Sequence, residues 1–316
     1  MKKVNILSYL SVFSLLFVIV YFVISPIFLL IQGLLPESHT VALRLYESFR
    51  EVSSVSIIGQ FLRGLAFALI FYPFLEFFLK NRRGKLIMFL SMWAVALIGS
   101  VEPQPGSFEG IIYTFITFWE HLLVILAVAI QMGVFVLLFF KLMEYFNKEK
   151  KQVKKEKEEV LELDSKKIKK YSMRFLVVHF LTYMIVGSIF YEISGYGEAL
   201  ETMEIFKLWR PQEEIVSVLL VFFGQIFRGL FLALLLYPFY HLYINKKNGW
   251  LLLFLLMFGL TALGSPLFLT EFILFEGTLI DFFKELVIGI PEIFSQMLVF
   301  SLIFFFWQKR VELKSK

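Results

Sequence analysis

Residues 59–73 read GQFLRGLAFALIFYP, and residues 224–238 read GQIFRGLFLALLLYP. Nine of these fifteen positions are identical between the two stretches, and the offset in residue number is constant. The matching Gln, Arg, Tyr and Pro are informative because polar and helix-breaking residues are costly inside an apolar membrane helix. The two stretches therefore predict a transmembrane helix that occurs twice and carries a buried arginine each time.

The composition of the whole chain fits this interpretation. Apolar residues make up 59% of the 316 residues, whereas soluble domains contain about 45–50%. Several runs exceed the roughly 18 apolar residues that a helix needs to cross a bilayer. The first run, over residues 7–35, is too long for a signal peptide and is expected to stay in the protein as a helix. The predicted fold class is an all-α integral membrane protein.

The sequence shows no recognisable metal, cofactor or nucleic-acid site. The chain contains no cysteine, which excludes disulfides and thiol chemistry. Glu120-His121 has the residue types of an acid–base or metal pair, but no second histidine lies at ligand spacing. The net charge of +5 comes from basic residues beside helix ends, which is typical of membrane topology. We therefore expect no cofactor, no metal and no nucleic-acid partner.

The duplication extends beyond the opening stretch. The further matches are Gly99-Ser100 with Gly264-Ser265, Phe108-Glu109-Gly110 with Phe275-Glu276-Gly277, Gln131-Met132 with Gln296-Met297, and Phe13 and Tyr21 with Phe175 and Tyr183. About eight spans are predicted, in two groups of four: residues 6–34, 55–79, 86–101 and 115–142, and then 172–193, 215–244, 250–268 and 282–307. The chain thus divides into a first four-helix repeat over residues 1–144, a charged linker over 145–170 and a second four-helix repeat over 171–316.

The basic residues predict the orientation of these spans. They gather on one side, at Lys2, Lys3, residues 80–85, the linker, Lys246, Lys247 and the C-terminal tail. Since cytoplasmic loops carry an excess of Lys and Arg, both termini and the linker are predicted to be cytoplasmic, in a cell membrane. An even number of spans per repeat makes the two halves parallel. They would be related by a pseudo-twofold axis along the membrane normal.

Five polar positions are the same in both copies: Gln60 and Gln225, Arg63 and Arg228, Tyr72 and Tyr237, Glu120 and Glu285, and Gln131 and Gln296. Arg63 lies about eight residues into its span, roughly 12 Å deep, so its side chain does not reach the interface easily. It should face protein or a water-filled cavity. Gln60 lies on the same helical face, and Glu120 is predicted at a depth within reach of Arg63.

Each half can thus present Gln, Arg, Glu and a second Gln toward one polar seam, and the two seams can line a central cavity. Two interpretations of this seam stay open. An Arg–Glu pair with glutamine hydrogen bonds can simply hold helices together in hydrocarbon. Alternatively, the arginines bind an anionic group and the glutamates balance or gate them. The sequence does not decide between the two.

Pro73 and Pro238 lie inside long apolar runs, at the ends of the duplicated stretch. A proline there removes a backbone hydrogen bond and is predicted to kink the helix. Two symmetry-related kinks suit an alternating-access protein, although prolines are also common in ordinary membrane helices.

Two further local signals concern helix starts. Glu109-Gly110 and Glu276-Gly277 precede the fourth span of each half. They predict either a short re-entrant helix or the capped start of a helix in an outer loop. Asp164-Ser165 is predicted to cap the helix that follows the linker.

The leading functional hypothesis is a multi-pass protein of transporter-like design that binds a small, possibly anionic solute or a lipid headgroup between its halves. Its partners would be the lipid bilayer and this ligand. Two alternatives stay open: a membrane-embedded enzyme that modifies lipids, or a non-catalytic scaffold or complex subunit. The chain lacks Walker, HExxH and GxSxG motifs, so no known chemistry is indicated and an enzyme is the less favoured interpretation.

Overall fold

The computed structural model describes residues 5–45, 54–147, 164–194, 208–211, 214–264 and 279–314. Apart from an isolated antiparallel bridge between Thr114 and Trp209, the regular elements of these residues are all helices. Before the linker these are α1 (Ile6–Gly33), η1 (Glu37–His39), α2 (Val41–Leu45), α3 (Ser54–Phe71), η3 (Tyr72–Phe74), α4 (Leu75–Lys80), α5 (Gly84–Leu90), η4 (Ser91–Ile98), α6 (Phe108–Tyr113) and α7 (Phe118–Asn147). After it come α8 (Ser165–Ile193), α10 (Ile215–Leu236), η7 (Tyr237–Phe239), α11 (Tyr240–Ile244), α12 (Gly249–Phe258), η8 (Gly259–Leu263) and α14 (Leu279–Lys314).

Six helices in this part of the chain are long and apolar enough to cross a membrane. They cover Ile6–Gly33, Ser56–Lys80, Phe118–Phe146, Ser165–Ile193, Ile215–Ile244 and Gly289–Lys314. Two further apolar helices, Gly84–Ile98 and Gly249–Leu263, are shorter than the roughly 20 residues that a span usually needs. The predicted class, an all-α multi-pass membrane protein, is confirmed at this level, whereas eight full spans stay a prediction.

The helices α3 and α10 both end at a tyrosine–proline step. Pro73 lies in the 3-10 turn η3, which leads into α4, and Pro238 lies in the 3-10 turn η7, which leads into α11. Proline has no amide hydrogen, and its ring clashes with the preceding turn of an α-helix. Each proline therefore marks an interruption within a longer apolar segment.

The packing of α1 on α7 recurs in the packing of α8 on α14. The ring centroids of Phe13 and Phe135 lie 4.7 Å apart, and those of Phe175 and Phe300 also lie 4.7 Å apart. All four rings are buried. In the alignment of the two halves, Phe175 corresponds to Phe13 and Phe300 corresponds to Phe135. The same interhelical contact is therefore built twice from residues at matching positions.

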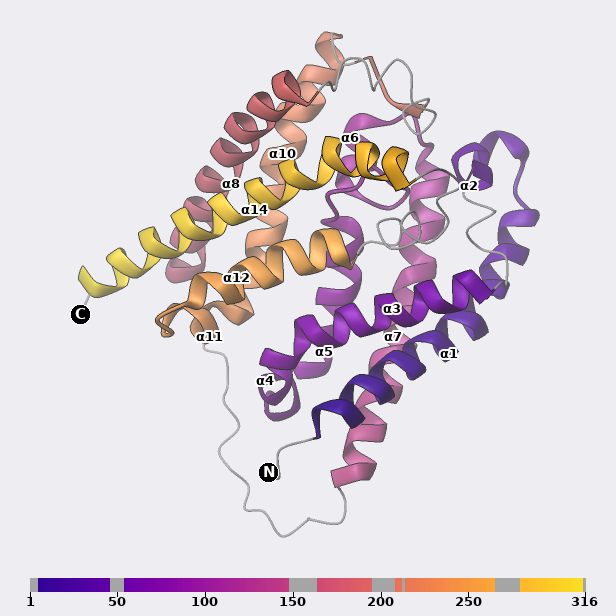
Figure 1. Cartoon of the computed structure of the whole chain (residues 1–316), viewed down its shortest axis with the longest axis horizontal. Helices are drawn as coiled ribbons and strands as arrows, with labels where there is room; N and C mark the ends of the chain where they lie inside the picture. Colours follow the sequence, from indigo (N-terminus) through magenta and orange to yellow (C-terminus); the bar gives the residue numbers. More distant parts are fainter. Residues whose placement is uncertain are drawn as a thin grey trace.

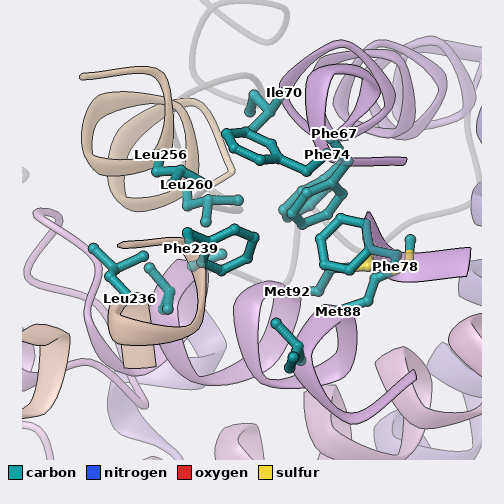
Figure 2. Packing of buried hydrophobic residues seen from close by; sticks show 14 of the residues in the cluster. Phe67, Ile70, Phe74, Phe78, Met88, Met92, Leu236, Phe239, Leu256 and Leu260 are labelled. Atoms are coloured by element: carbon teal, nitrogen blue, oxygen red, sulfur yellow. The ribbon is translucent and has the colours of Figure 1, made fainter. Parts of the chain in front are cut away.

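The duplicated stretches meet in a shared apolar core. Figure 2 shows Phe67, Phe74 and Phe78 facing Leu236 and Phe239 across this core. Phe74 and Phe239 directly follow the matching prolines, and their rings form an edge-to-face contact with centroids 5.2 Å apart. Each ring is at most 1% exposed. The segments that follow the two matching prolines therefore face each other directly at this point.

Figure 1 shows how the elements are distributed. The helices α1, α3 and α7 lie toward the lower right, and α8, α10 and α14 lie toward the upper left. Both termini and the short turns before α5 and α12 lie at the end of the molecule away from α2 and α6.

Asp164 caps α8 as predicted, because its side chain accepts hydrogen bonds from the backbone N–H groups of Lys166 and Lys167.

Candidate functional site

A buried polar cluster surrounds Arg228 in α10. The side chain of Arg228 is 1% exposed. Its Nη1 lies 2.9 Å from Oε1 of Glu109 in α6, which makes a buried ion pair. Gln225, one turn earlier on the same face of α10, donates from Nε2 to both Glu109 oxygens at 3.0 and 3.2 Å. The Oε1 of Gln225 accepts a 3.4 Å bond from Arg228. The predicted shared face of Gln225 and Arg228 is therefore used to hold one carboxylate.

The second partner of Arg228 is the backbone carbonyl of Gly99. Its Nε and Nη2 donate to this oxygen at 3.3 and 3.0 Å. Gly99 follows the π-helical segment η4, where backbone carbonyls point beyond the helix end and attract a cation. A Cβ at Gly99 would lie 2.6 Å from Cδ2 of Leu232. The missing side chain thus allows α10 to approach this helix end closely enough for Arg228 to reach it.

Glu109 is held in place by a tightly folded turn before α6. Ser107 is the N-cap of this helix, and its Oγ accepts a 2.9 Å bond from the N–H of Gly110. A Cβ at Gly110 would clash with the carbonyl oxygen of Gln104. Only glycine therefore lets the turn fold back onto α6. The structure shows a short helix with a capped start, which fits both alternatives that the sequence predicts for this segment.

Further titratable side chains surround the pair. From α8, His179 lies beside Arg228 and Gln225, and Tyr183 lies beside Glu109 and Arg228. The hydroxyl of Tyr183 hydrogen-bonds to that of Tyr113 in α6. Burial raises the pKa of the Glu109 carboxyl, whereas the charge of Arg228 and the hydrogen bond from Gln225 lower it. The protonation of Glu109 therefore depends on whether Arg228 stays in contact with it.

Arg63 in α3 makes the contact that corresponds to the one between Arg228 and Gly99, but from the first half of the chain to the second. It is 4% exposed, and its Nε donates a 3.2 Å bond to the carbonyl oxygen of Gly264 at the end of η8. Arg63 corresponds to Arg228 in the duplicated stretch, and Gly99 corresponds to Gly264 in the matching Gly-Ser pair. Each arginine therefore binds the end of a short apolar helix that belongs to the other half of the chain.

The surroundings of the two arginines differ in polarity. The guanidinium carbon of Arg63 lies 5.6 and 5.8 Å from the ring centroids of Phe17 and Phe67, which are cation–π distances. Tyr21 and Glu102 also lie near Arg63. In the alignment that matches Phe13 with Phe175, His179 stands in the second half where Phe17 stands in the first. The Arg228 site is thus the more polar of the two.

Glu120 has partners different from the predicted one. Its Oε1 accepts hydrogen bonds from the backbone N–H groups of Ala42 and Leu43 at 2.6 and 3.2 Å. Its Oε2 accepts from the N–H and the hydroxyl of Thr117, both at 2.9 Å. Thr117-Phe118-Trp119-Glu120 is a capping box, in which the carboxylate closes the start of its own helix. Glu120 therefore caps α7 and holds α2, and the predicted pairing with Arg63 is replaced by these contacts.

The remaining predicted site residues are more scattered. Gln60 is buried in α3, and its Oε1 has no hydrogen-bond partner among the described residues. The same holds for Nε2 of the buried Gln131 in α7. Gln296 donates a 3.0 Å bond to Glu292 within α14, beside Gly187 of α8. The side chain of Glu285 lies outside the described part of the structure. Among the residues that the structure describes, Gln225 and Arg228 are the only members of the predicted seam that hydrogen-bond to each other directly.

Two residues of the site, Glu109 and Gly99, are not among the predicted site residues. Both lie in motifs that occur twice in the sequence, Phe108-Glu109-Gly110 and Gly99-Ser100. That repetition is the signal that could have found them. It is a weak signal on its own, because a glutamate beside a turn and a glycine at a helix end have common local explanations.

His121 is part of the same framework. Its Nδ1 accepts a 2.9 Å bond from the N–H of Gly106, a residue with a positive φ of 92° that suits glycine.

Within the described ranges, no three His, Asp or Glu side chains are placed to hold a metal ion. No protein-family model, curated protein or solved structure matches the chain.

Proposed function

We propose that the chain consists of two tandem four-helix membrane repeats, over residues 1–144 and 171–316, with the linker 145–170 between them. The pseudo-twofold axis between the repeats passes close to Phe74 and Phe239. The matching aromatic contacts and the two exchanged arginine–carbonyl contacts support this arrangement. In this arrangement the short helices Gly84–Ile98 and Gly249–Leu263 are the third span of each repeat, which makes eight spans.

The orientation that we propose places both termini and the linker in the cytoplasm of a cell-membrane protein. The turns before α5 and α12 carry the basic residues of segments 80–85 and 245–249, and they lie at the same end as both termini (Figure 1). The chain has no cysteine, so the single variants Ser38→Cys and Asn81→Cys can be probed in intact cells with an impermeant maleimide. We expect labelling at position 38 and protection at position 81; the reverse pattern would overturn the orientation.

For its function, we propose a transporter-like protein that binds a small oxyanion, either a free solute or a lipid headgroup, between the two repeats. The observation that carries this proposal is the buried guanidinium of Arg228, which holds a carboxylate at 2.9 Å. A guanidinium presents several N–H donors in a geometry that suits carboxylate and phosphate groups. The site lies where both repeats contribute groups, Gly99 and Glu109 from one and Arg228 from the other.

The surrounding architecture supports a ligand site more than a simple helix contact. Residues 99–107, between η4 and α6, are irregular, and several of them, among them Gln104 and Ser107, are buried. Irregular backbone inside a membrane protein is tolerated where it is enclosed by protein or lines a cavity. Broken helices of this kind form the binding sites of many transporters.

The test is equilibrium binding of radiolabelled acetate, sulfate and phosphate to purified protein, followed by uptake into proteoliposomes. We expect binding by the unmodified protein and a loss of at least tenfold in affinity for Arg228→Gln, because one strong charged hydrogen bond is worth about 1.4 kcal/mol or more. Lys85→Gln, at an exposed surface pair with Glu144, is the matched control and should bind normally. Equal affinity of the Arg228 variant and the unmodified protein would overturn the site.

A further inference from the structure

The Arg228 site already contains an anion, which is supplied by the protein itself. Glu109 occupies Nη1 of the guanidinium at 2.9 Å, and the Gly99 carbonyl occupies Nε and Nη2. The carbonyl is backbone at the end of η4, so a side-chain rotation does not remove it. The described contacts leave only one N–H of Nη2, so an oxyanion that binds the guanidinium through two N–H groups would have to take the position of the Glu109 carboxylate. Ligand and carboxylate compete for the same donor.

Because the site is buried, a net charge on it is costly. Arg228 is 1% exposed, Glu109 is 4% exposed, and Gln225 is fully buried. Arg228 and an ionised Glu109 together carry no net charge. Adding a monovalent oxyanion gives a net negative charge, and a buried charge without a partner is costly. If Glu109 binds a proton at the same time, the site stays neutral with the oxyanion in place.

Gln225 allows both states of Glu109. Its Nε2 now donates to the two carboxylate oxygens, and its Oε1 accepts from Arg228. An amide carries donors and an acceptor. After protonation, the Glu109 hydroxyl can donate to this amide oxygen once Arg228 has turned to the ligand. The same side chain therefore satisfies the carboxylate before the exchange and the carboxylic acid after it.

The other ionisable groups around Glu109 come from every neighbouring element. His121 of α7 approaches through the neighbouring Gly110, since its Cε1 lies 3.1 Å from the position of a Cβ there. The C-terminal end of η4 contributes only its backbone carbonyl. The groups that face the pair are Arg228 and Gln225 from α10, His179 and Tyr183 from α8, and Tyr113 from α6. Arg228 is the one cation in contact with the carboxylate within the described residues.

We propose that Glu109 is the proton-binding residue of this site, and that its protonation releases Arg228 to bind one oxyanion, so that one proton and one anion bind together. This inference rests on the proposed anion-binding function. The balance is one proton taken up from water onto Glu109 for each monovalent oxyanion that pairs with Arg228. Both leave together when the ion pair between Glu109 and Arg228 forms again.

The test measures proton uptake by the unmodified protein in weak buffer with an indicator dye. Methanesulfonate is the soluble probe, because its own charge does not change between pH 5 and 8. Nanodiscs of phosphatidylglycerol, compared with phosphatidylcholine, are the headgroup probe. We expect about one proton per anion bound, and an affinity that rises about tenfold for each unit by which the pH is lowered, since linkage between the two ligands is reciprocal.

Variants locate the proton. Glu109→Gln should bind the probe with an affinity independent of pH and take up no proton, because glutamine cannot ionise. Glu144→Gln, an exposed carboxylate paired with Lys85, should behave as the unmodified protein does. His179→Gln should keep the proton uptake. If Glu109→Gln folds poorly, the absence of proton uptake by the unmodified protein, or its loss in His179→Gln, still overturns the role of Glu109.

The outcomes separate the two proposals. Absence of binding for both probes overturns the oxyanion site itself, and the inference with it. Binding that depends on Arg228 without proton uptake overturns only the role of Glu109. Proton uptake that survives in Glu109→Gln and disappears in His179→Gln also overturns it. Binding of methanesulfonate identifies a solute as the ligand source, and a preference for phosphatidylglycerol identifies a headgroup.

Discussion

The two buried arginines occupy matching positions and bind matching carbonyls, yet their surroundings differ. Arg63 lies against the rings of Phe17 and Phe67, whereas Arg228 forms an ion pair with Glu109 beside His179. The shared contact, from an arginine to the end of a short helix, explains how the two halves are held together. The difference is that only the Arg228 site, of the two, pairs the arginine with a carboxylate in the described residues, and this pairing is the basis of the proposed anion and proton binding. The two arginines thus share one contact at matching positions of the sequence and differ in the side chains around it.

The largest expected effect comes from removing the cation of the more polar site. Arg228→Gln leaves Glu109 buried without its described cation, which should destabilise the protein by about 3–5 kcal/mol. The measurement is thermal or denaturant unfolding in detergent, followed by tryptophan fluorescence. Glu109→Gln in the same chain should recover a large part of this loss, because it removes the unpaired charge. Additive effects of the two substitutions would contradict a direct coupling.

Arg63→Gln should cost less than Arg228→Gln. The substitution removes a charged hydrogen bond to Gly264 and two cation–π contacts, which together are worth about 2–3 kcal/mol. The same unfolding experiment gives the comparison. A loss for Arg63→Gln that is larger than the loss for Arg228→Gln would reverse the distinction between the two sites.

The shared part of the comparison depends on the two acceptor glycines. A Cβ at Gly99 would meet Leu232 at 2.6 Å, and a Cβ at Gly264 would meet the carbonyl oxygen of Leu260 at 2.6 Å. Alanine at either position should therefore cost about 2 kcal/mol through forced backbone and side-chain shifts. Gly33→Ala, where no atom lies within 4 Å, is the matched control. If the first two variants lose no more stability than this control, the contact is not tight.

The smallest expected effect comes from substituting Glu120. It tests whether this carboxylate caps helices or pairs with Arg63. Glu120→Ala removes hydrogen-bond acceptors from the starts of α2 and α7 and should cost about 1 kcal/mol. Combined with Arg63→Gln, the two losses should add within about 0.5 kcal/mol, because the residues share no described contact. Unfolding of the double variant provides the value. A clear deviation from additivity would restore the pairing that the sequence predicts.

The sequence predicts the features that depend on local spacing. The membrane class follows from the length and composition of the apolar runs, and the common face of Gln225 and Arg228 follows from their positions one helical turn apart. The cap at Asp164 is also a local signal. These predictions succeed because neighbouring residues on a helix have a fixed geometry whatever surrounds them.

The partners of the arginines depend on contacts between distant segments and could not be predicted in the same way. Glu109 and Gln225 lie 116 residues apart, and Gly99 and Arg228 lie 129 apart. Depth in the membrane alone makes Glu120 a candidate partner for Arg63. The local sequence from Thr117 to Glu120 already contains the capping box that uses this carboxylate. A local explanation of this kind should be tested before a distant partner is assigned.

The contact between Arg63 and Gly264 also has a consequence for biosynthesis. The two residues lie 201 positions apart, so the ribosome delivers Arg63 to the membrane long before its acceptor exists. Arg228, in contrast, emerges after Gly99 and Glu109 have already been made. The Arg63 contact therefore forms only after the second half has been made, whereas the partners of Arg228 have been made before it. A chain that stops before residue 264 lacks the acceptor of this hydrogen bond and leaves a buried arginine without it.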